Sequence, residues 1–448
     1  MTPDGPRRLA VIGGGIAGLA AAYAARRTSP DRDLSITLFE SSATMGGKIL
    51  TELHGGELYE WGPDSFLASK PEARRLADDL GLDLVAPGPA GRRAYLLIDG
   101  RLRPIPPGLV LGVPTRARTL LAAVRDNLLS PLGALRAAIE PALPALPSKD
   151  RSVADLARRR LGKEVAERLV GPLLAGVFGT PADELSAAVS FPNNPRSLVL
   201  AMRRRPLPDA PPFLAPRKGM GQFVQTLTQR LDKEDLRIGT PAPPIRPAPN
   251  ARFLIGDEPP FDGVILAVPA PQAANLLEPV SPPATALLRS VATRSAVVFH
   301  LRYDDNAFGR PLDAAGFLVA GTRASTEVVT GCSWLNPKWP HLAIDGLRLR
   351  VVVSSRAATK LPDDRLIAKV VEEIGRAMDA RGDPTQVRLK RLPEAMHVYA
   401  TGHLDLVTRL RRRLPPGIAI AGALLGGVGI PDCIRTGEEA VHAALSAS

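Results

Sequence analysis

The chain has 448 residues, more than one hydrophobic core usually holds, so two or three domains are expected. Hydrophobic residues make up 45% of it and aromatic residues only 4%, a balance that favours a folded globular protein and disfavours nucleic-acid binding. The net charge of +12 suits an anionic partner, such as a polycarboxylate substrate or an acidic membrane surface, although the abundance of Arg, Ala and Pro explains it equally well.

The residues that could bind metals or span a membrane are few. Cys332 and Cys433 lie far apart, which argues against a disulfide framework and a CxxC metal site, and the six histidines have no metal-ligand spacing. Residues 1–8 are polar and do not resemble a signal peptide. No uncharged stretch reaches the roughly 20 apolar residues of a transmembrane helix. We therefore expect a cytoplasmic protein without a metal, with peripheral membrane contact left open.

The first predicted element is a short buried strand over residues 9–12. It is followed by the pattern G-x-G-x-x-G at Gly13, Gly15 and Gly18, and by an Ala-rich helix over residues 16–27. The first glycine permits a tight turn, the second lets the backbone approach a pyrophosphate, and the third brings helix and strand together. The helix start adds N–H groups and a positive dipole end. This combination predicts a dinucleotide-binding fold.

A second predicted strand, residues 34–39, ends in Glu40, 22 residues beyond Gly18. A carboxylate at about this spacing is expected to accept the ribose hydroxyls of an adenosine and to repel a 2′-phosphate, which argues against NADP. The step Met45–Lys48 follows, with two glycines and a basic residue. Its backbone can pass close to a pyrophosphate and its lysine can neutralise phosphate charge, as in flavin oxidases; an ordinary loop is the alternative interpretation.

Between these motifs and the C-terminal region the residue pattern predicts a series of shorter elements. In chain order they are the end of a short helix at 78–84, a β-hairpin at 92–103, a Pro- and Leu-rich helical zone from 106 to about 205, a helix at 222–231, an irregular Pro-rich turn at 241–249, a buried strand at 261–269, strands at 296–303 and 347–354, and an amphipathic helix at 363–379.

The C-terminal region mirrors the first motif. Residues 417–422 read as a strand, and residues 426–445 read as a helix with a glycine-lined start. Pro431 suits the first helical turn, where its missing N–H has no cost. Such a helix start, aimed at a flavin, stabilises negative charge on the reduced ring. The N- and C-terminal segments are therefore expected in one domain.

Four segments together resemble the FAD-dependent porphyrinogen oxidases of haem synthesis, the protoporphyrinogen IX oxidases and their coproporphyrinogen III oxidase relatives. They are MGGKIL at 45–50, EWGPDSFLASKPE at 60–72, LLAGVFGTPADELS at 173–186 and GVGIPDCI at 427–434. The resemblance implies an α/β fold with a Rossmann-like FAD domain of the p-hydroxybenzoate hydroxylase type. We expect that domain at 1–85, 215–270 and 396–448, a mixed-sheet substrate domain at 86–105 and 271–395, and a helical insert at 106–214.

The resemblance also implies a function. The chain is expected to be an FAD-dependent oxidoreductase that oxidises a porphyrinogen with O2 and releases H2O2, by hydride transfer from a meso carbon to the flavin. Coproporphyrinogen III is the preferred substrate and protoporphyrinogen IX is next. Two alternatives stay open: a diverged amine oxidase or desaturase relative, and an FAD-binding protein without porphyrinogen activity. A ferrochelatase or another haem-pathway enzyme is a candidate partner.

The site residues follow from the same resemblance. No catalytic side chain is expected, because the cofactor carries the redox chemistry. Lys70 is expected to bind a substrate propionate, with Arg92, Arg93, Arg101 and Arg103 as weaker candidates. The expected cofactor-binding residues are Gly13, Gly15, Ile16, Ala17, Gly18, Glu40, Ser41, Gly47, Lys48, Gly62, Pro63, Asp64, Ser65, Gly422, Val428, Gly429 and Ile430.

One segment departs from the family pattern. Where relatives have Asn, an aromatic residue and a basic residue, this chain has Ala423, Leu424 and Leu425. An amide and two larger side chains near the flavin are missing, which puts the detailed substrate pocket in doubt. The backbone of the predicted cofactor cradle is unaffected.

Overall fold

The computed structural model describes residues 6–29, 33–147, 149–191, 196–204, 211–320 and 327–446. The chain divides into two compact units. Unit 1 comprises Met1–Val85, Pro212–Ala292 and Leu404–Ser448, and unit 2 comprises Ala86–Pro211 and Thr293–His403. Each unit is thus assembled from separate stretches of the chain.

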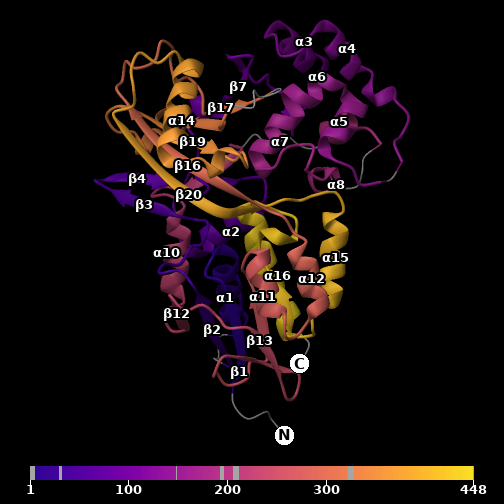
Figure 1. Cartoon of the computed structure of the whole chain (residues 1–448), viewed down its shortest axis with the longest axis vertical. Helices are drawn as coiled ribbons and strands as arrows, with labels where there is room; N and C mark the ends of the chain where they lie inside the picture. Colours follow the sequence, from indigo (N-terminus) through magenta and orange to yellow (C-terminus); the bar gives the residue numbers. More distant parts are fainter. Residues whose placement is uncertain are drawn as a thin grey trace. The chain divides into compact units, whose positions relative to one another are not determined.

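Unit 1 contains both ends of the chain (Figure 1). Its strands are β1 (Arg7–Ile12), β2 (Leu34–Glu40), β3 (Thr51–His54), β4 (Glu57–Glu60), β5 (Phe66–Leu67), β6 (Leu84–Val85), β11 (Phe213–Pro216), β12 (Asp235–Ile238), β13 (Ile245–Ala248), β14 (Arg252–Ile255), β15 (Gly263–Leu266) and β21 (Ile418–Ile420). Its helices are α1 (Ile16–Thr28), α2 (Pro71–Leu80), α10 (Gly221–Arg230), α11 (Ala270–Leu277), α12 (Pro282–Arg289), α15 (His403–Arg413), which begins at the last residue of unit 2, the 3-10 turn η6 (Ala423–Leu425) and α16 (Ile430–Leu445).

The centre of unit 1 is a parallel sheet. Its strand order is β12-β2-β1-β15-β21, and each neighbouring pair is parallel. Residues Leu9–Ile12 of β1 are buried, because helices cover a parallel sheet on both faces. This explains why the strand reads as a continuous apolar run, and it confirms the predicted α/β class.

Helices α1 and α16, from opposite ends of the chain, pack against each other in unit 1. They lie side by side in Figure 1, drawn in indigo and yellow. The close approach depends on Gly437, where a Cβ atom would overlap the carbonyl oxygen of Ala17. The ends of the chain therefore meet in one unit, as the two glycine motifs predicted.

Helices α11 and α12 also belong to unit 1, although we expected residues 271–292 in the substrate domain. Ala273, Leu277 and Leu288 from these helices are fully buried in the same core as Leu266 of β15. Their small and aliphatic side chains fill the space beside the parallel sheet. The chain therefore leaves unit 1 later than the sequence pattern indicated.

Unit 2 contains a mixed sheet and a helical segment. Its strands are β7 (Tyr95–Ile98), β8 (Arg101–Pro104), β9 (Leu109–Val110), β10 (Val113–Pro114), β16 (Thr293–Tyr303), β17 (Gly316–Val319), β18 (Val329–Trp334), β19 (Leu347–Val353) and β20 (Gln386–His397). Its helices and helical turns are η1 (Ala90–Arg92), α3 (Ala117–Arg125), α4 (Pro131–Ala138), η2 (Glu140–Ala142), α5 (Val153–Leu161), α6 (Lys163–Val165), the π-helical η3 (Ala166–Val170), α7 (Gly171–Phe178), α8 (Ala187–Ser190), α9 (Leu198–Arg203), α13 (Leu335–Lys338), η4 (Pro340–Leu342), η5 (Ala358–Lys360) and α14 (Asp363–Met378).

The sheet of unit 2 has the order β20-β16-β19-β18-β17-β7-β8. The pair β17–β7 is parallel and the other pairs are antiparallel, so the sheet is mixed as predicted. Helix α14 buries Leu366, Val370, Ile374 and Met378, which recur every four residues and share a core with the sheet. Of residues 106–214, which were predicted as a separate helical insert, 106–211 fall in this same unit and 212–214 in unit 1. Residues 396–403, predicted in the FAD domain, also fall in unit 2.

Two segments were predicted wrongly. Residues 109–114 were expected to be helical but form the antiparallel strand pair β9–β10. Residues 241–249 were expected to be irregular, but Ile245–Ala248 pairs with β14. Pro247 is tolerated because both strands of a two-stranded sheet are edges.

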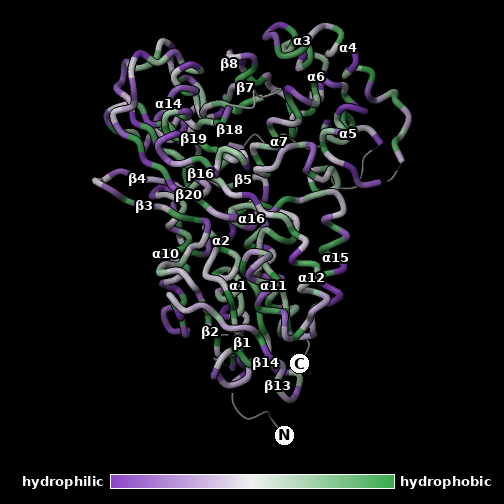
Figure 2. The backbone as a smooth tube through the Cα atoms, in the orientation of Figure 1, coloured by the Kyte–Doolittle hydropathy of each residue, from purple (hydrophilic) through white to green (hydrophobic). Residues whose placement is uncertain are grey.

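Helix α15 is strongly amphipathic. It buries Val407 and Leu410 and exposes Arg411–Arg413, and Figure 2 draws much of it in hydrophilic colours. Among the helices of the described residues, none is both long and apolar enough to cross a membrane.

Candidate functional site

The turn after β1 has the geometry of a dinucleotide-binding turn. Gly13 has φ +113°, a conformation that favours glycine, and a Cβ there would lie 2.5 Å from the carbonyl oxygen of Ala267. A Cβ on Gly18 would overlap the carbonyl oxygen of Gly13. The first and third glycines of the motif are therefore needed for the fold of this turn itself.

Gly15 differs from both, because the space beside it is open. A Cβ there would have no neighbour nearer than the carbonyl oxygen of Gly46, at 4.0 Å. Gly15 is also the N-cap of α1, which has no side-chain cap and no acidic residue in its first turn, formed by Ile16, Ala17 and Gly18. The uncapped amide end of this helix, with room for a ligand beside it, fits a pyrophosphate.

Glu40 is held in place by the backbone at the end of β2. Its Oε2 accepts a hydrogen bond from the Gly14 N–H at 2.7 Å, and its Oε1 accepts one from the Ser42 N–H at 2.7 Å. The Ser41 hydroxyl lies 3.5 Å from Oε1. Each carboxylate oxygen can accept more than one hydrogen bond, so this fixed and nearly buried group can still accept ribose hydroxyls.

The Met45–Lys48 step lies against the first glycine turn. The Gly46 N–H donates to the Gly14 carbonyl oxygen at 2.8 Å, and Gly46 forms a parallel bridge with Gly15. Gly47 has φ +56° and also approaches Gly15, while Lys48 is exposed. This step therefore forms a second wall of the open space at Gly15.

The segment Gly62–Ser65 follows in the same unit. A Cβ on Gly62 would overlap the carbonyl oxygen of Lys48, so the segment passes directly over the second wall. The Ser65 hydroxyl donates to Oδ1 of Asp64 at 3.0 Å, and Pro63, Asp64 and Ser65 are half-buried. Their assignment to the cofactor stays a prediction.

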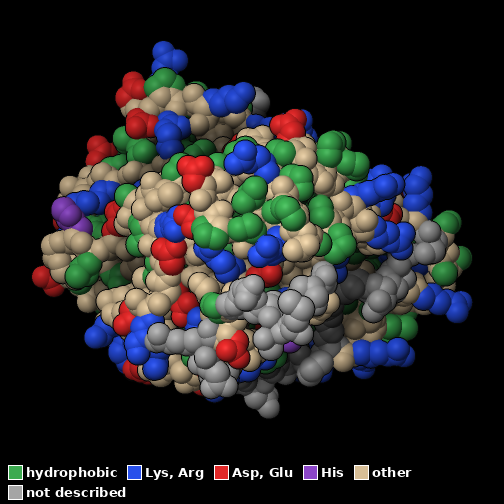
Figure 3. Space-filling model, turned by 90° about the horizontal axis from the view of Figure 1, so that it is seen from below, with side chains coloured by type: hydrophobic (Ala, Val, Ile, Leu, Met, Phe, Trp, Pro, Cys, Tyr) green, Lys and Arg blue, Asp and Glu red, His purple; other side chains and the backbone are tan. Residues whose placement is uncertain are grey.

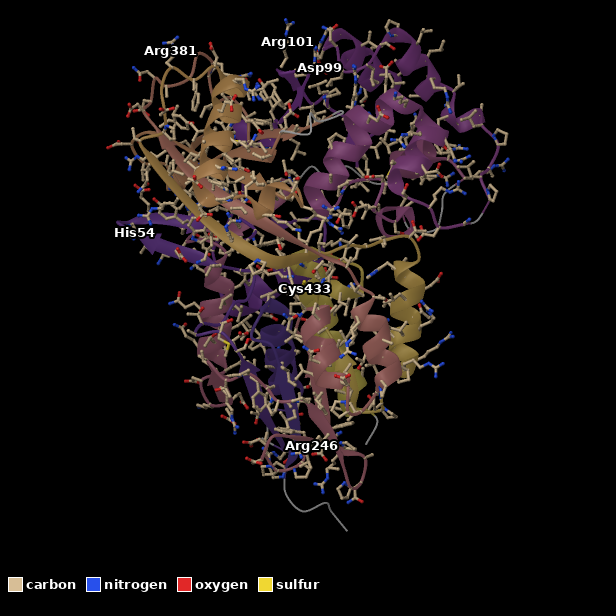
Figure 4. The ribbon with its side chains drawn as sticks, in the orientation of Figure 1. His54, Asp99, Arg101, Arg246, Arg381 and Cys433 are labelled. Atoms are coloured by element: carbon tan, nitrogen blue, oxygen red, sulfur yellow. The ribbon has the colours of Figure 1, made fainter. Side chains whose placement is uncertain are left out.

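The C-terminal glycine motif lies at the start of α1. Gly422 has φ +100°, its N–H donates to Oγ1 of Thr436 at 2.9 Å, and a Cβ on it would lie 3.6 Å from the Cβ of Ala17. Gly429 is the N-cap of α16, without a side-chain cap; Val428 precedes it and Ile430 begins the helix. Figure 4 labels Cys433 near this end of α16. Two uncapped helix starts, from α1 and α16, thus belong to one unit.

The segment that departs from the family pattern packs against the core of unit 1. Residues Ala423–Leu425 form a 3-10 turn directly after β21. Leu424 is buried in the core of unit 1, and Leu425 packs against the same core from a partly buried position. In this chain the segment therefore contributes apolar packing.

The predicted substrate residue Lys70 is engaged within unit 1. Its Nζ lies 2.6 Å from both Oδ1 and Oδ2 of Asp432, the third residue of α16. We did not predict this pair; the only local signal was an acidic residue just after a glycine helix start. That Lys70 binds substrate stays a prediction.

The weaker candidates, Arg92, Arg93, Arg101 and Arg103, all lie in unit 2. Arg93 approaches Asp313 at 3.8 Å, and Nη1 of Arg103 donates to the Asp126 carbonyl oxygen at 3.3 Å. Arg101 is exposed beside the hairpin turn at Asp99 (Figure 4). The structure gives these arginines no common site within unit 2.

Comparison with known proteins decides the family. The model of the family described as flavin containing amine oxidoreductase matches residues 16–445. The chain belongs to the flavin-containing amine oxidoreductase family. The cradle at Gly15, Glu40 and the two helix starts fits the dinucleotide form of the family's flavin, and the cofactor is FAD.

Within this family, the chain is similar over its whole length to proteins named as porphyrinogen oxidases. It is 34% identical to the coproporphyrinogen III oxidase of Bacillus subtilis (strain 168), with 99% of each chain covered. It is 29% identical to the coproporphyrinogen III oxidase of Staphylococcus aureus, with 98% and 99% covered. A crystal structure from Exiguobacterium sp. 255-15, provisionally named a protoporphyrinogen oxidase, matches with a TM-score of 0.84 and 30% identity over 99% of both chains.

Proposed function

We propose that this chain oxidises coproporphyrinogen III to coproporphyrin III in haem biosynthesis, with FAD as cofactor and O2 as electron acceptor. The observation that carries the proposal is the end-to-end similarity to relatives named coproporphyrinogen III oxidase, at 34% identity in the case of Bacillus subtilis. The cradle of unit 1 supports it, because the open space at Gly15 and the fixed carboxylate of Glu40 suit a dinucleotide. We assign unit 1 to the cofactor and unit 2 to the substrate.

The chemistry needs little from side chains. FAD, when bound, supplies a two-electron acceptor that O2 reoxidises. A porphyrinogen loses six electrons and six hydrogens in becoming a porphyrin, so three O2 become three H2O2. The residues of the cradle would hold and orient the dinucleotide: Gly15 would leave room for the pyrophosphate, and Glu40 would accept hydrogen bonds from the ribose hydroxyls. The positive helix starts favour negative charge on the cofactor.

The test is direct reduction of the flavin by substrate. Purified holoenzyme mixed anaerobically with coproporphyrinogen III is expected to lose its visible flavin absorption, and admission of O2 is expected to restore it with the appearance of porphyrin fluorescence. About three H2O2 per porphyrin are expected from the electron balance above. A flavin that stays oxidised with this substrate would overturn the proposal and favour a flavoprotein without porphyrinogen activity.

Protoporphyrinogen IX is the second candidate substrate. A chloroplastic protoporphyrinogen oxidase of Arabidopsis thaliana is 25% identical to this chain, with 96% of this chain and 86% of the relative covered. The lower identity favours coproporphyrinogen III, and so does the net charge of +12, since that substrate carries more carboxylates. Comparison of kcat/KM for the two porphyrinogens decides between them.

We propose a cytoplasmic location, which the two free, buried cysteines support because a reducing compartment preserves thiols.

We also propose peripheral contact with an acidic membrane. Leu121, Leu132, Leu135 and Ile139 are exposed on or next to α3 and α4, with Arg118 beside them on α3. On the face drawn in Figure 3, Lys and Arg occur at several separate places. Co-sedimentation with vesicles of acidic and neutral lipid tests this contact.

A ferrochelatase or another haem-pathway enzyme is the protein partner that we propose, since the product is a metal-free porphyrin. An enzyme that inserts iron into the product would consume it directly. Co-purification and a change in the rate of porphyrin transfer between the two enzymes test this partnership.

A further inference from the structure

An ion pair in unit 1 joins the start of α2 to the start of α16. Lys70 is the N-cap residue of α2 and follows the segment that passes over the second wall of the cradle. Its Nζ contacts both carboxylate oxygens of Asp432 at 2.6 Å, although the two residues are 362 positions apart. The Asp432 side chain is 12% exposed and that of Lys70 43%, so the pair is partly shielded from water.

The carboxylate of Asp432 is fixed over the glycine turn that begins α16. A Cβ on Gly427 would overlap the side chain of Asp432, and a Cβ on Gly429 would lie 3.0 Å from Oδ2. The glycines therefore leave the space that the carboxylate occupies. A negative charge in this place opposes the positive end of the helix dipole, which is the feature expected to favour negative charge on the reduced flavin.

The Nζ of Lys70 lies closer to that carboxylate, at 2.6 Å, than Arg435 does. Arg435 also approaches Asp432, at 4.0 Å, but its Nη1 is already bonded to Glu439 at 2.7 Å. Oε1 of Glu72 lies 4.0 Å from Nε of Arg435. At 2.6 Å against 4.0 Å, Lys70 thus neutralises the charge of Asp432 more directly than Arg435 does.

We propose that Lys70 is a positioning residue for the cofactor: by neutralising Asp432, it keeps the start of α16 electrically positive and so raises the midpoint potential of the bound FAD. This inference rests on the assignment of α16 to the cofactor in the proposed function. It gives Lys70 a task different from the binding of a substrate propionate. The pair also ties the segment before α2 to the C-terminal glycine motif.

Redox titration of the flavin in the holoenzyme, without any porphyrinogen, tests the proposal. An opposite charge within about 4–6 Å of a group shifts the equilibrium between the charged and the neutral form of that group by at least about tenfold. In Lys70→Met the relative affinity for reduced over oxidised flavin is expected to fall about tenfold, a midpoint shift of about 30 mV to more negative values. Asp432→Asn is expected to shift the potential in the opposite direction, and the double variant to return near the unmodified value.

Two further variants serve as controls. Lys70→Arg keeps the charge and is expected to keep the potential. Arg75→Met removes the neighbouring ion pair of the same two helices, with Glu438, and is expected to leave the potential unchanged. If the pair were merely structural, Lys70→Met and Asp432→Asn would both lower the flavin occupancy or the melting temperature. The midpoint potential would then not shift in opposite directions in the two variants.

The proposal is overturned if Lys70→Met and Asp432→Asn leave the potential unchanged or move it in the same direction. It is also overturned if Lys70→Met raises the KM for coproporphyrinogen III at an unchanged potential, since Lys70 would then be a substrate cation. If Asp432→Asn does not retain FAD, the midpoint potentials of Lys70→Met and Lys70→Arg still test the proposal. A lower potential in Lys70→Met alone supports it, and equal potentials overturn it. If the enzyme were inactive on porphyrinogens, the proposed function would be refuted. The redox titration would still test the role of Lys70, because it uses no porphyrinogen.

Discussion

Gly15 and Gly18 lie three residues apart in one turn, yet their surroundings differ. Gly15 has φ −74° and ψ 176°, values that alanine adopts freely, and the space beside it is open. We expect Gly15→Ala to fold normally, with a melting temperature within a few degrees of the unmodified chain. Its Kd for FAD is expected to rise at least about tenfold, because the new methyl group occupies the place of the pyrophosphate.

Gly18→Ala is the matched control for this prediction. Its methyl group would overlap the carbonyl oxygen of Gly13, so the contact between α1 and β1 must open. Overpacking of this kind costs about 1–3 kcal/mol, and the free energy of unfolding of the apoprotein is expected to fall by that amount. Equilibrium denaturation and titration of the apoproteins with FAD separate the two effects. Equal stability losses in both variants would contradict the assignment of Gly15 to the cofactor.

At the scale of elements, a buried ion pair organises the helical segment of unit 2. Nε of Arg160, on α5, donates to Oε1 of Glu140 at 2.7 Å, and both side chains are almost completely buried. The other carboxylate oxygen accepts from the hydroxyl of Ser197, the N-cap of α9. The carboxylate of Glu140 therefore fixes the positions of α5 and α9 together.

Glu140→Gln is expected to reduce the free energy of unfolding by about 3–5 kcal/mol, because the guanidinium of Arg160 remains buried without a countercharge. Urea denaturation measures the change. Glu372→Gln is the matched control: its partner Arg376 is exposed on α14, and removal of an exposed pair costs about 0–1 kcal/mol. Similar losses in both variants would mean that burial of the Glu140 pair contributes nothing.

Helix α4 carries a pH-dependent cap. Glu164 accepts from the hydroxyl of Ser130 at 2.6 Å and from its N–H at 2.7 Å, and Ser130 caps α4. The hydroxyl bond is the main cause that holds the pKa of Glu164 below its ordinary value of 4.5. A lowered pKa contributes stability that is present above pH 4.5 and lost as the pH falls through the folded value.

Glu164→Gln is therefore expected to be less stable than the unmodified chain at about pH 6 and to lose less stability between about pH 5 and pH 3. Urea denaturation at these pH values measures both quantities. If Glu164→Gln shows the same loss between these pH values as the unmodified chain, the cap is not the group that titrates.

The elements that local patterns determine were predictable from the sequence. The strand β1, the turn at Gly13 and the helix α1 follow one another within 22 residues, and each has its own signal. The strand β13 was missed because its proline is tolerated only at a sheet edge, which no local pattern reveals. Lys70 and Asp432 are brought together by the fold across 362 positions, so no spacing rule could pair them.

At the scale of the whole molecule, the two ends of the chain complete unit 1 jointly. Nη2 of Arg7, on β1, donates to the carbonyl oxygen of Leu445 at the end of α16, at 2.7 Å. The start of α1 and the segment at Gly422 likewise lie together. We therefore expect FAD binding to require both terminal segments but not their order along the chain. A circular permutant tests this expectation.

We expect a permutant with residue 446 joined to residue 6 by a short Gly-Ser linker, and new ends between Asn250 and Ala251, to bind FAD stoichiometrically. Those two residues form the exposed turn between β13 and β14, where new termini cost few contacts. A chain truncated at residue 416 retains the first glycine motif but lacks β21 and α16, and it is expected to bind no FAD. Flavin absorbance after gel filtration compares the two. A colourless permutant that is nevertheless folded, or a truncated chain that retains FAD, would show that the two ends do not build the cofactor site together.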